Sequence, residues 1–521
     1  MKKSFLMDGF LAILLGIVLM FAFAPYNLFP FAILAPAGLL GLWLKVAPSR
    51  KKAFYLGFLF GVGLFTSGVY WIFISIHVIG NVPTALALLI TAGFIAILSC
   101  FPATVGYILN HYFPANTPEK MLYAFPAIWL LMEMLRGAFF PWLFLGYSQT
   151  HWPLKGYAAL IGVYGITLLL TICSGLLVNA ARHYQHRHFK SCWLSLLMIA
   201  IICAFGGICS FIPWTITQGK PVSVALVQGN IPQTVKWSPE YLELSLHTYD
   251  SLTEPLWGKA DIIIWPESAL PIPLQNVQPL INELHQKAQD SHSVLILGIP
   301  IRRPDNKTFY NAIITLGAEL QPPYTKRHLV PFGEFTPFES WLANTLQFLD
   351  IPMSEMAEGP RNQPPLTVNK LKIEPSICYE IAFPDLTRSP DKTINMLLVL
   401  TNDAWFGHSS AESQHLQMAA MRALEFAKPV LFVSNDGITA IIDQHGNVQA
   451  SLPQFKAGVL QSTVQPMYGL TPWLNNGVDP FWFIFVLFFS LAILANKKAL
   501  ANKTSPGSGD KIRAKAKPPI H

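Results

Sequence analysis

Charged residues are scarce in this chain of 521 residues. Asp, Glu, Lys and Arg make up 12% of it and hydrophobic residues 52%, whereas a typical soluble domain has about 25% charged residues. This shortage excludes a wholly soluble protein. The composition favours an integral membrane protein that carries a soluble part.

Cysteine is almost absent from the long polar stretch of the sequence. A lone thiol in a stretch of roughly 250 residues cannot form an internal disulfide, so Cys378 is either an inert core residue or a nucleophile. No Cys and His cluster has metal-ligand spacing, and His183, His186 and His188 are expected in a solvated basic loop. We therefore expect no metal and no other cofactor. The other five cysteines lie within or beside apolar runs: Cys100, Cys173, Cys192, Cys203 and Cys209.

Long hydrophobic runs are present instead, and about 20 apolar residues are needed to cross a bilayer as a helix. We predict about eight spans, of which the second and eighth are short. The first run could be a signal peptide ending at Ala22-Phe23-Ala24, but it is longer than the usual apolar core of ~7–15 residues, so an uncleaved span is favoured. The predicted spans are Phe5–Ala24, Phe29–Leu44, Ala53–Ile76, Val82–Leu109, Met121–Phe140, Tyr157–Ala180, Cys192–Ile212 and Phe481–Ala495.

The basic residues predict how the chain is oriented. They fall on alternate loops between the spans, and such residues concentrate on the cytoplasmic side. The tail from Lys497 to His521 holds seven Lys or Arg against the single acid Asp510; a cytoplasmic tail is favoured over a nucleic-acid-binding arm. We therefore predict a bundle of seven spans (1–214), an outer, periplasmic domain (219–470), an eighth span (477–496) and a basic cytoplasmic tail (497–521).

The outer stretch has the pattern of an α/β domain. Short β-branched runs alternate with amphipathic ones, which is typical of a sheet covered by helices. The expected helices are Pro239–Leu256, Pro279–Gln289 and Ala411–Lys428. The expected strands are Val222–Gln228, Asp261–Trp265, Val294–Gly298, Asn311–Leu316, Ile373–Cys378, Met396–Thr401, Val430–Ser434 and Thr439–Ile442.

Three residues near strand ends could together carry out acyl transfer. A thiolate from Cys378 is a good nucleophile, Glu267 could take its proton, and Lys326 could stabilise the oxyanion and favour the thiolate. Each also has an ordinary explanation: Cys378 as a small core residue, Glu267 as a helix cap after Pro266, and Lys326 as surface charge.

The order and context of these residues resemble the Glu-Lys-Cys triad of the carbon–nitrogen hydrolase (nitrilase) superfamily. With seven spans before the domain and one after it, nearly the whole chain resembles the apolipoprotein N-acyltransferase family. The segments that carry this resemblance are Phe23–Tyr26, Pro141-Trp142, Gly146–Gln149, Val227–Trp237, Trp265–Ser268, His328–Glu334, Ile377–Glu380, Asn402–Gly407 and Met421–Glu425.

The resemblance implies a fold and a set of site residues. The fold is an αββα sandwich attached to a polytopic helical membrane bundle. Glu267 is implied to be the general base, Lys326 the oxyanion stabiliser and Cys378 the nucleophile. Further residues are implied to shape the site (Glu334, Tyr379 and Glu380), to line it (Trp237 and Asn402), or to match family positions of less settled role (Arg136 and Glu425). Arg136 could instead form an interfacial ion pair with Glu133.

The implied activity is N-acylation of the diacylglyceryl-cysteine at the N-terminus of apolipoproteins in the bacterial inner membrane. A phospholipid, with phosphatidylethanolamine as the expected donor, would acylate Cys378 in a ping-pong reaction. One alternative is a membrane-tethered carbon–nitrogen hydrolase (an amidase) that uses water as acceptor, although a tether needs only one span. The other is a transporter with an outer sensing domain, although ionisable residues are few in the spans. No nucleic-acid partner is expected.

Overall fold

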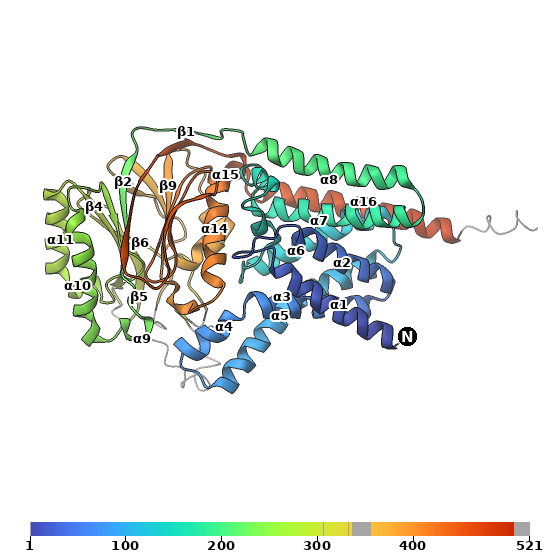
Figure 1. Ribbon diagram of the computed structural model, residues 1–521, viewed down its shortest axis with the longest axis horizontal. Helices are drawn as coiled ribbons and strands as arrows, with labels where there is room; N and C mark the ends of the chain where they lie inside the picture. Colours follow the sequence, from blue (N-terminus) through green and yellow to red (C-terminus); the bar gives the residue numbers. More distant parts are fainter. Residues whose placement is uncertain (1, 306, 332, 336–355, 505–521) are drawn as a thin grey trace, which may run out of the picture.

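The protein consists of a helical bundle and an α/β sandwich that pack against each other (Figure 1). The computed structural model describes residues 2–305, 307–331, 333–335 and 356–504. The first residues of α1 and the end of α16 lie at the end of the bundle that faces away from the sandwich. Residues 505–521 of the predicted tail lie outside the described residues.

The bundle is built from helices at the positions of the predicted spans, although several boundaries differ. The run predicted as Ala53–Ile76 breaks after Gly68, and α16 continues beyond the predicted end of the eighth span. The bundle contains α1 (Lys2–Met20), α2 (Phe31–Val46), α3 (Arg50–Gly68), α4 (Trp71–Ile74), the π-helix η1 (Ser75–Ile79), α5 (Thr84–Tyr112), the π-helix η2 (Lys120–Ala124), α6 (Phe125–Gly137), α7 (Ala158–Gln185), α8 (Phe189–Cys209) and α16 (Asp479–Thr504), with the 3-10 helices η3 (Leu145–Gln149) and η4 (Pro153–Tyr157) before α7.

Four helical stretches are long and apolar enough to cross a membrane: α5, η4 with α7, α8, and most of α16. A fifth crossing would be formed by α3 together with the Trp71–Ile79 segment, which is bent from it by 55°. The apolar helices Ser4–Met20 and Phe31–Val46 are shorter. The described residues thus support a membrane part, with fewer full-length spans than the eight predicted.

Glycines allow α3 to pack closely between two neighbouring helices. A Cβ on Gly63 would lie 2.2 Å from the carbonyl oxygen of Ile13 on α1, and one on Gly57 would lie 2.5 Å from that of Pro102 on α5. Small residues at such positions let membrane helices approach until their backbones touch. This packing fixes α3, from which the bent α4–η1 segment extends toward the sandwich.

The sandwich consists of two six-stranded sheets that pack face to face. The first has the order β13-β2-β3-β4-β5-β6 and the second the order β12-β11-β10-β9-β8-β7. Their centres are parallel (β2, β3 and β4; β8, β9 and β10) and their edges antiparallel. The bounds are β2 (Val222–Gln228), β3 (Ile262–Ile264), β4 (Val294–Arg302), β5 (Phe309–Leu316), β6 (Tyr324–Thr325), β7 (Leu366–Val368), β8 (Leu371–Ile377), β9 (Ile394–Thr401), β10 (Val430–Ser434), β11 (Thr439–Ile442), β12 (Val448–Leu452) and β13 (Gly458–Val464).

Both faces of the first sheet are apolar, because one packs on the second sheet and the other on helices. Along β2, Val224 and Leu226 point into the core shared with the second sheet, whereas Ala225 and Val227 point to the outer helices α10 (Leu242–Thr253) and α11 (Gln278–Asp290). Alternation along a strand places neighbouring residues on opposite faces. On the other side, α14 (Ala411–Phe426) lies between the second sheet and the bundle. These four layers confirm the nitrilase-like αββα fold.

The strand predictions were correct for the central strands and missed most of the edges. β2, β10 and β11 have the predicted bounds, whereas β6, β7, β12 and β13 were not predicted. Buried central strands are continuous apolar runs, but edge strands are half-exposed and lack that signal. A further pair, β1 (Thr215–Thr217) with β14 (Met467–Gly469), joins the two chain segments that connect the bundle and the sandwich.

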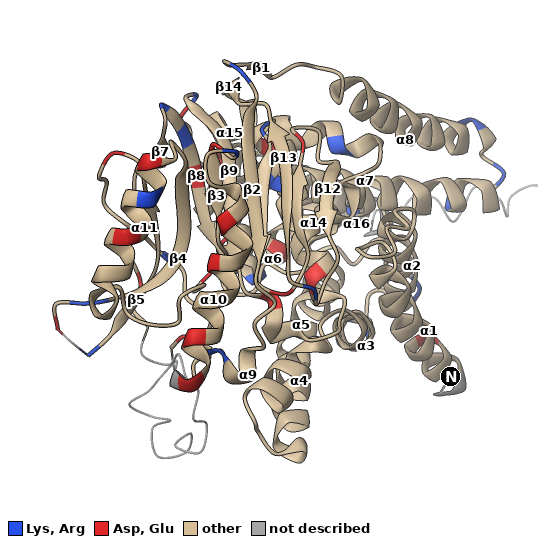
Figure 2. Cartoon of the chain, turned by 60° about the vertical axis from the view of Figure 1, so that its left-hand side comes forward, with Lys and Arg blue, Asp and Glu red and all other residues tan. Residues whose placement is uncertain are grey.

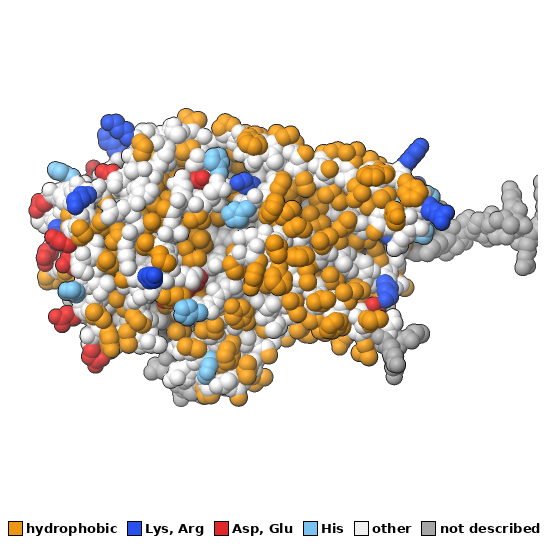
Figure 3. Space-filling view, in the orientation of Figure 1, with side chains coloured by type: hydrophobic (Ala, Val, Ile, Leu, Met, Phe, Trp, Pro, Cys, Tyr) orange, Lys and Arg blue, Asp and Glu red, His pale blue; other side chains and the backbone are white. Residues whose placement is uncertain are grey.

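The surface separates the two parts by polarity. Hydrophobic side chains cover the bundle in the space-filling view, and charged ones gather on the sandwich and at the bundle's far end (Figure 3). The ribbon coloured by charge shows the same division, with few charged residues along the middle of the bundle helices (Figure 2). Such an apolar band is what a bilayer requires of the surface in contact with it.

Candidate active site

The predicted catalytic side chains come from loops that follow strands of the two sheets. Glu267 follows β3, Lys326 follows β6 and Cys378 follows β8. All three are buried, with Lys326 only 1% exposed. Ligand sites of α/β sheets form where strands end, because the chain there is free to carry polar groups.

Lys326 lies between two carboxylates. Its Nζ is 2.8 Å from Oε1 of Glu334 and 3.3 Å from Oε1 of Glu267. Asn311 Nδ2 donates to the same two oxygens, at 2.7 Å to Glu267 and 3.2 Å to Glu334. Burial by itself would lower the pKa of Lys326, but the charges of Glu334 and Glu267 raise it above its usual value. Lys326 is therefore a fixed cation.

Cys378 sits at a sharp turn beside this cluster. It is the first residue of the 3-10 helix η8 (Cys378–Ala382) and has the left-handed φ of 51° that non-glycine residues rarely adopt. Burial and then the charge of Glu267 raise the pKa of its thiol, against the opposing effect of Lys326. Lys326 thus favours the thiolate, as expected, but burial and Glu267 outweigh it, so the resting group is the thiol. A nucleophilic Cys378 needs a base that removes its proton during the reaction.

Glu380 holds the turn that carries Cys378. Its carboxylate accepts from the backbone N–H of Ile377 at 2.7 Å and from the Tyr324 hydroxyl at 2.8 Å, and it also accepts from the backbone N–H of Arg327. Burial raises its pKa, which the nearby Arg327 charge opposes. Glu380 therefore ties the Cys378 turn to the strand that leads into Lys326.

Tyr379 follows Cys378 in the chain, Asn402 comes directly after β9, and Trp237 packs in a separate small cluster. The Tyr379 hydroxyl donates to the carbonyl of Phe139 in the bundle at 3.0 Å. Asn402 Nδ2 donates to Gln233 at 2.6 Å. Trp237 is half-buried and packs beside the cluster of Leu329 and Met356. The role of these three residues in lining a site stays a prediction.

Arg136 is removed from the carboxylate cluster and organises a loop. Its guanidinium donates to the carbonyls of Phe140 at 3.0 Å and Leu143 at 3.3 Å, and also to that of Trp142. Glu133 instead accepts from Trp129, Leu145 and Thr167. Within the part of the chain that the structure describes, Arg136 and Glu133 form no direct ion pair, so the proposed interfacial pair was wrong.

Glu425 also lies away from the cluster, where α14 meets the bundle. It pairs with Arg422 and accepts the backbone N–H of Val163 at 2.8 Å. Val163 follows a break in α7 at Gly162 (φ 62°), so its N–H has no partner within the helix. Glu425 thus caps the second part of α7 and joins the two halves of the protein.

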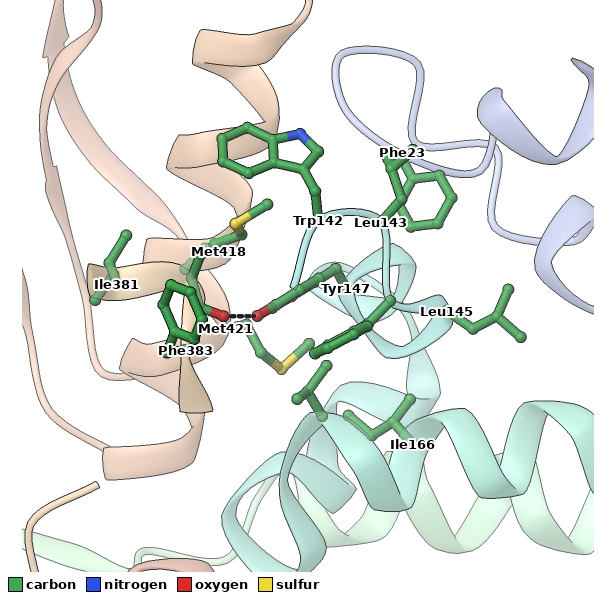
Figure 4. Close-up of a cluster of buried hydrophobic side chains, with 14 of the residues drawn as sticks. Phe23, Trp142, Leu143, Leu145, Tyr147, Ile166, Ile381, Phe383, Met418 and Met421 are labelled. Carbon is green, nitrogen blue, oxygen red and sulfur yellow. Dashed lines mark hydrogen bonds between the residues drawn. The ribbon is translucent and has the colours of Figure 1, made fainter. Parts of the chain in front are cut away.

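Several residues of the family-like segments meet at the junction of bundle and sandwich. Tyr147 donates to the carbonyl of Ala382 at 2.8 Å and accepts from Arg422 at 2.8 Å. Trp142 Nε1 donates to Gln414 on α14. Figure 4 shows Trp142 and Tyr147 directed from the bundle toward Met418 and Met421 of the sandwich. The bundle therefore contacts Ala382, the last residue of the turn that begins at Cys378, directly.

The sequence analysis missed three side chains near the carboxylates and Cys378. Asn311 bridges Glu267 and Glu334, Lys236 Nζ donates to the carbonyl of Glu267 at 3.1 Å, and His415 bonds the carbonyl of Cys378 at 3.1 Å. Asn311 had a signal, being a polar residue at the start of an apolar strand. Lys236 and His415 had none, because each lies in a polar helical stretch. Among the described residues, no group of three or more His, Cys, Asp or Glu side chains could hold a metal ion.

Known proteins resemble the chain over nearly its whole length. Residues 15–176 match the model of the apolipoprotein N-acyltransferase N-terminal domain, and residues 223–472 match that of carbon–nitrogen hydrolases. An apolipoprotein N-acyltransferase of Coxiella burnetii is 39% identical over 94% of this chain and 100% of its own. The chain belongs to the apolipoprotein N-acyltransferase family. The corresponding proteins of Vibrio cholerae (38% identical over 92% of this chain and 95% of the relative) and Azotobacter vinelandii (38%, 95% and 96%) support the same assignment.

Two solved structures match about half of the chain. A CN-hydrolase superfamily protein from Xanthomonas campestris covers 51% of this chain and 97% of its own, with 18% identity and a TM-score of 0.37. An amidase from Nesterenkonia sp. AN1 covers 48% and 93%, with 16% identity and a TM-score of 0.36. Membership of the apolipoprotein N-acyltransferase family makes the chain an acyltransferase with membrane helices.

Proposed function

We propose that the chain transfers an acyl group from a phospholipid to the α-amino group of the diacylglyceryl-cysteine that begins an apolipoprotein. The observation that carries this proposal is the buried Glu267–Lys326 pair beside the Cys378 turn, which is attached to an apolar bundle. A nucleophile, a base and a fixed cation are the parts that acyl transfer through a covalent intermediate requires.

In the first half-reaction, Glu267 removes the thiol proton while Sγ of Cys378 attacks the carbonyl carbon of the sn-1 ester. Lys326 stabilises the negative charge on the former carbonyl oxygen. The C–O bond then breaks, the departing alkoxide takes the proton from Glu267, and a lysophospholipid leaves. Glu334 and Asn311 support this step, because they hold Lys326 and the Glu267 carboxylate in place.

In the second half-reaction, the α-amino group of the apolipoprotein attacks the thioester. Glu267 accepts the proton of the amine, the C–S bond breaks, and Sγ of Cys378 regains a proton. The products are an amide and the free enzyme, so the cycle balances without a cofactor. Phosphatidylethanolamine is the donor that we propose, and Trp237, Tyr379 and Asn402 line the site.

The membrane arrangement follows from the same chemistry. Exposing acyl chains to water costs about 0.8 kcal/mol per CH₂, so the site has to lie at the bilayer surface. We propose eight crossings in a bacterial inner membrane, with 1–214 and 477–496 as its membrane parts, 219–470 in the periplasm and 497–521 in the cytoplasm. The position of α1's start and α16's end at the bundle's far end supports this orientation.

The mass of the intact protein after incubation with phosphatidylethanolamine tests the reaction. We expect an acyl adduct on Cys378 that is absent from Cys378→Ala and that disappears when a diacylglyceryl-cysteine peptide is added. An adduct that decays equally fast without the peptide, together with hydrolysis of small amides, would instead identify an amidase. A reporter fused after His521 tests the orientation, and a periplasmic reporter would overturn it.

A further inference from the structure

A buried histidine and aspartate lie behind Cys378, on the elements that follow the second sheet. His415 of α14 is fully buried, and its Nε2 is 3.1 Å from the carbonyl oxygen of Cys378. Its Nδ1 is 3.0 Å from Oδ1 of Asp403, which is also fully buried. Neither residue belongs to the Glu267–Lys326 cluster, and neither has a role in the reaction described above.

Hydrogen-bond partners lie at both ring nitrogens of His415. The carbonyl oxygen of Cys378 can only accept, so Nε2 must donate to it. Asp403 accepts hydroxyls from Thr401 at 2.8 Å and from Ser434 at 3.3 Å, which hold its carboxyl group in place. Nδ1 lies 3.0 Å from Oδ1 of Asp403, and the bond between them fixes the orientation of the ring.

The backbone of Cys378 needs such a contact. A φ of 51° is unfavourable for a residue with a Cβ, and such conformations persist only where the surroundings hold them. Glu380 holds the turn on one side through the N–H of Ile377. His415 holds the carbonyl on the other side, and the Thr401 hydroxyl bonds the thiol itself.

Aromatic rings keep the imidazole in place. The ring centroid of His415 lies 5.2 Å from that of Phe432, 5.8 Å from Trp142 and 6.2 Å from Phe406. Trp142 belongs to the loop held by Arg136, so the bundle also contributes to this packing. The ring has no exposed surface through which it could touch a substrate.

We propose that His415, oriented by Asp403, is a positioning residue that fixes the carbonyl of Cys378 and thereby directs Sγ toward Glu267 and Lys326. This inference rests on the proposed role of Cys378 as the nucleophile. Because His415 touches no substrate, its loss lowers the rate constant of acylation and leaves the KM for phospholipid unchanged. A displacement of about 1 Å at a reacting group can cost ~10²-fold in rate.

Two replacements of His415 separate positioning from packing. His415→Phe keeps a ring among its aromatic neighbours but has no N–H for the carbonyl of Cys378. His415→Gln places an amide N–H near the position of Nε2. His247→Phe, which changes an exposed histidine of α10, is the matched control.

For each variant, single-turnover acylation by phosphatidylethanolamine and the thermal midpoint are measured. We expect acylation to be ~10²-fold slower in His415→Phe, within about ten-fold of wild type in His415→Gln, and unchanged in the control, all at an unchanged KM. The proposal is overturned if folded His415→Phe acylates within about three-fold of wild type, or if His415→Gln is as slow as His415→Phe.

A second readout separates this inference from the proposed function. Alkylation of Cys378 by iodoacetamide depends on how the thiol is presented and needs no lipid. If wild-type protein forms no acyl adduct, the proposed function fails, and the alkylation rates of the same variants still decide the role of His415. Equal alkylation of wild type and His415→Phe would then refute the positioning role.

Discussion

Replacing Lys326 by Met should separate its structural from its chemical contribution. Its Nζ lies 2.8 Å from Glu334 and 3.3 Å from Glu267. With an effective dielectric constant of about 20, Coulomb's law gives an attraction of about 6 and about 5 kcal/mol for these contacts. Desolvation of the buried groups offsets part of this, and removing one partner of a buried ion pair typically costs about 3–5 kcal/mol.

Lys326→Met should therefore destabilise the sandwich. For a domain of about 250 residues, each kcal/mol lowers the thermal midpoint by about 2–4 °C, so we expect a decrease of roughly 6–20 °C. Two carboxylates that share the Asn311 amide would remain without a cation. Acylation should fall by at least ~10²–10³-fold, because the oxyanion has lost its donor.

The double replacement Lys326→Met/Glu334→Gln distinguishes these effects. It removes one of the two like charges, so we expect most of the lost stability to return. Acylation should stay as slow as in Lys326→Met, because nothing replaces the cation. The reasoning is refuted if Lys326→Met acylates within ten-fold of wild type, or if the double variant is no more stable than the single one; intact mass and thermal melting in detergent measure both.

Three further outcomes are expected. Cys378→Ser should form no acyl adduct detectable by mass, because an alcohol is a far poorer nucleophile than a thiol; an adduct of normal rate would exclude Cys378 as the nucleophile. Arg136→Lys should lower stability by about 2–4 kcal/mol and slow acyl transfer, because an ammonium cannot reach all three carbonyls that the guanidinium binds; a melting curve like that of wild type would contradict this. Burial, and then Asp403 and Asp436, raise the pKa of Glu412 to about 9. The folded state therefore keeps a proton that the unfolded chain loses near pH 4.5. The stability of the fold falls as the pH rises from about 4.5 to about 9. Glu412→Gln should therefore gain thermal stability relative to wild type between pH 5 and 9, by up to about 1.4 kcal/mol per pH unit, and a constant difference would show that Glu412 is ionised.

The part of the site that sequence could predict is the part with a local signal. Glu267 and Cys378 come after apolar runs of the sequence. In the structure, Glu267 follows β3 and Cys378 follows β8. Asn311 contacts Glu267, 44 residues away in the chain, and His415 contacts Cys378, 37 residues away. No local pattern reveals such pairings, since they depend on how two sheets and a helix are placed relative to one another.

The fold shows the same limit. The apolar runs of β2, β10 and β11 predicted their bounds, because both faces of these strands are covered. The break of α3 after Gly68 was not predicted, because the hydrophobic run continues through it. The sequence singled out Arg136 and Glu425 but not their partners. Arg136 binds carbonyls of the Phe140–Leu143 loop, and Glu425 binds the N–H of Val163.

The turn η8, which carries Cys378, is held from both halves of the protein. Phe139 and Tyr147 bind it from the bundle, and Glu380 and His415 bind it from the sandwich. A sandwich expressed by itself would lose two anchors of the turn that carries Cys378. Separate family models match the two regions, yet the regions depend on each other. Exchanging one half between relatives would require the contact residues of the other half to be exchanged with it.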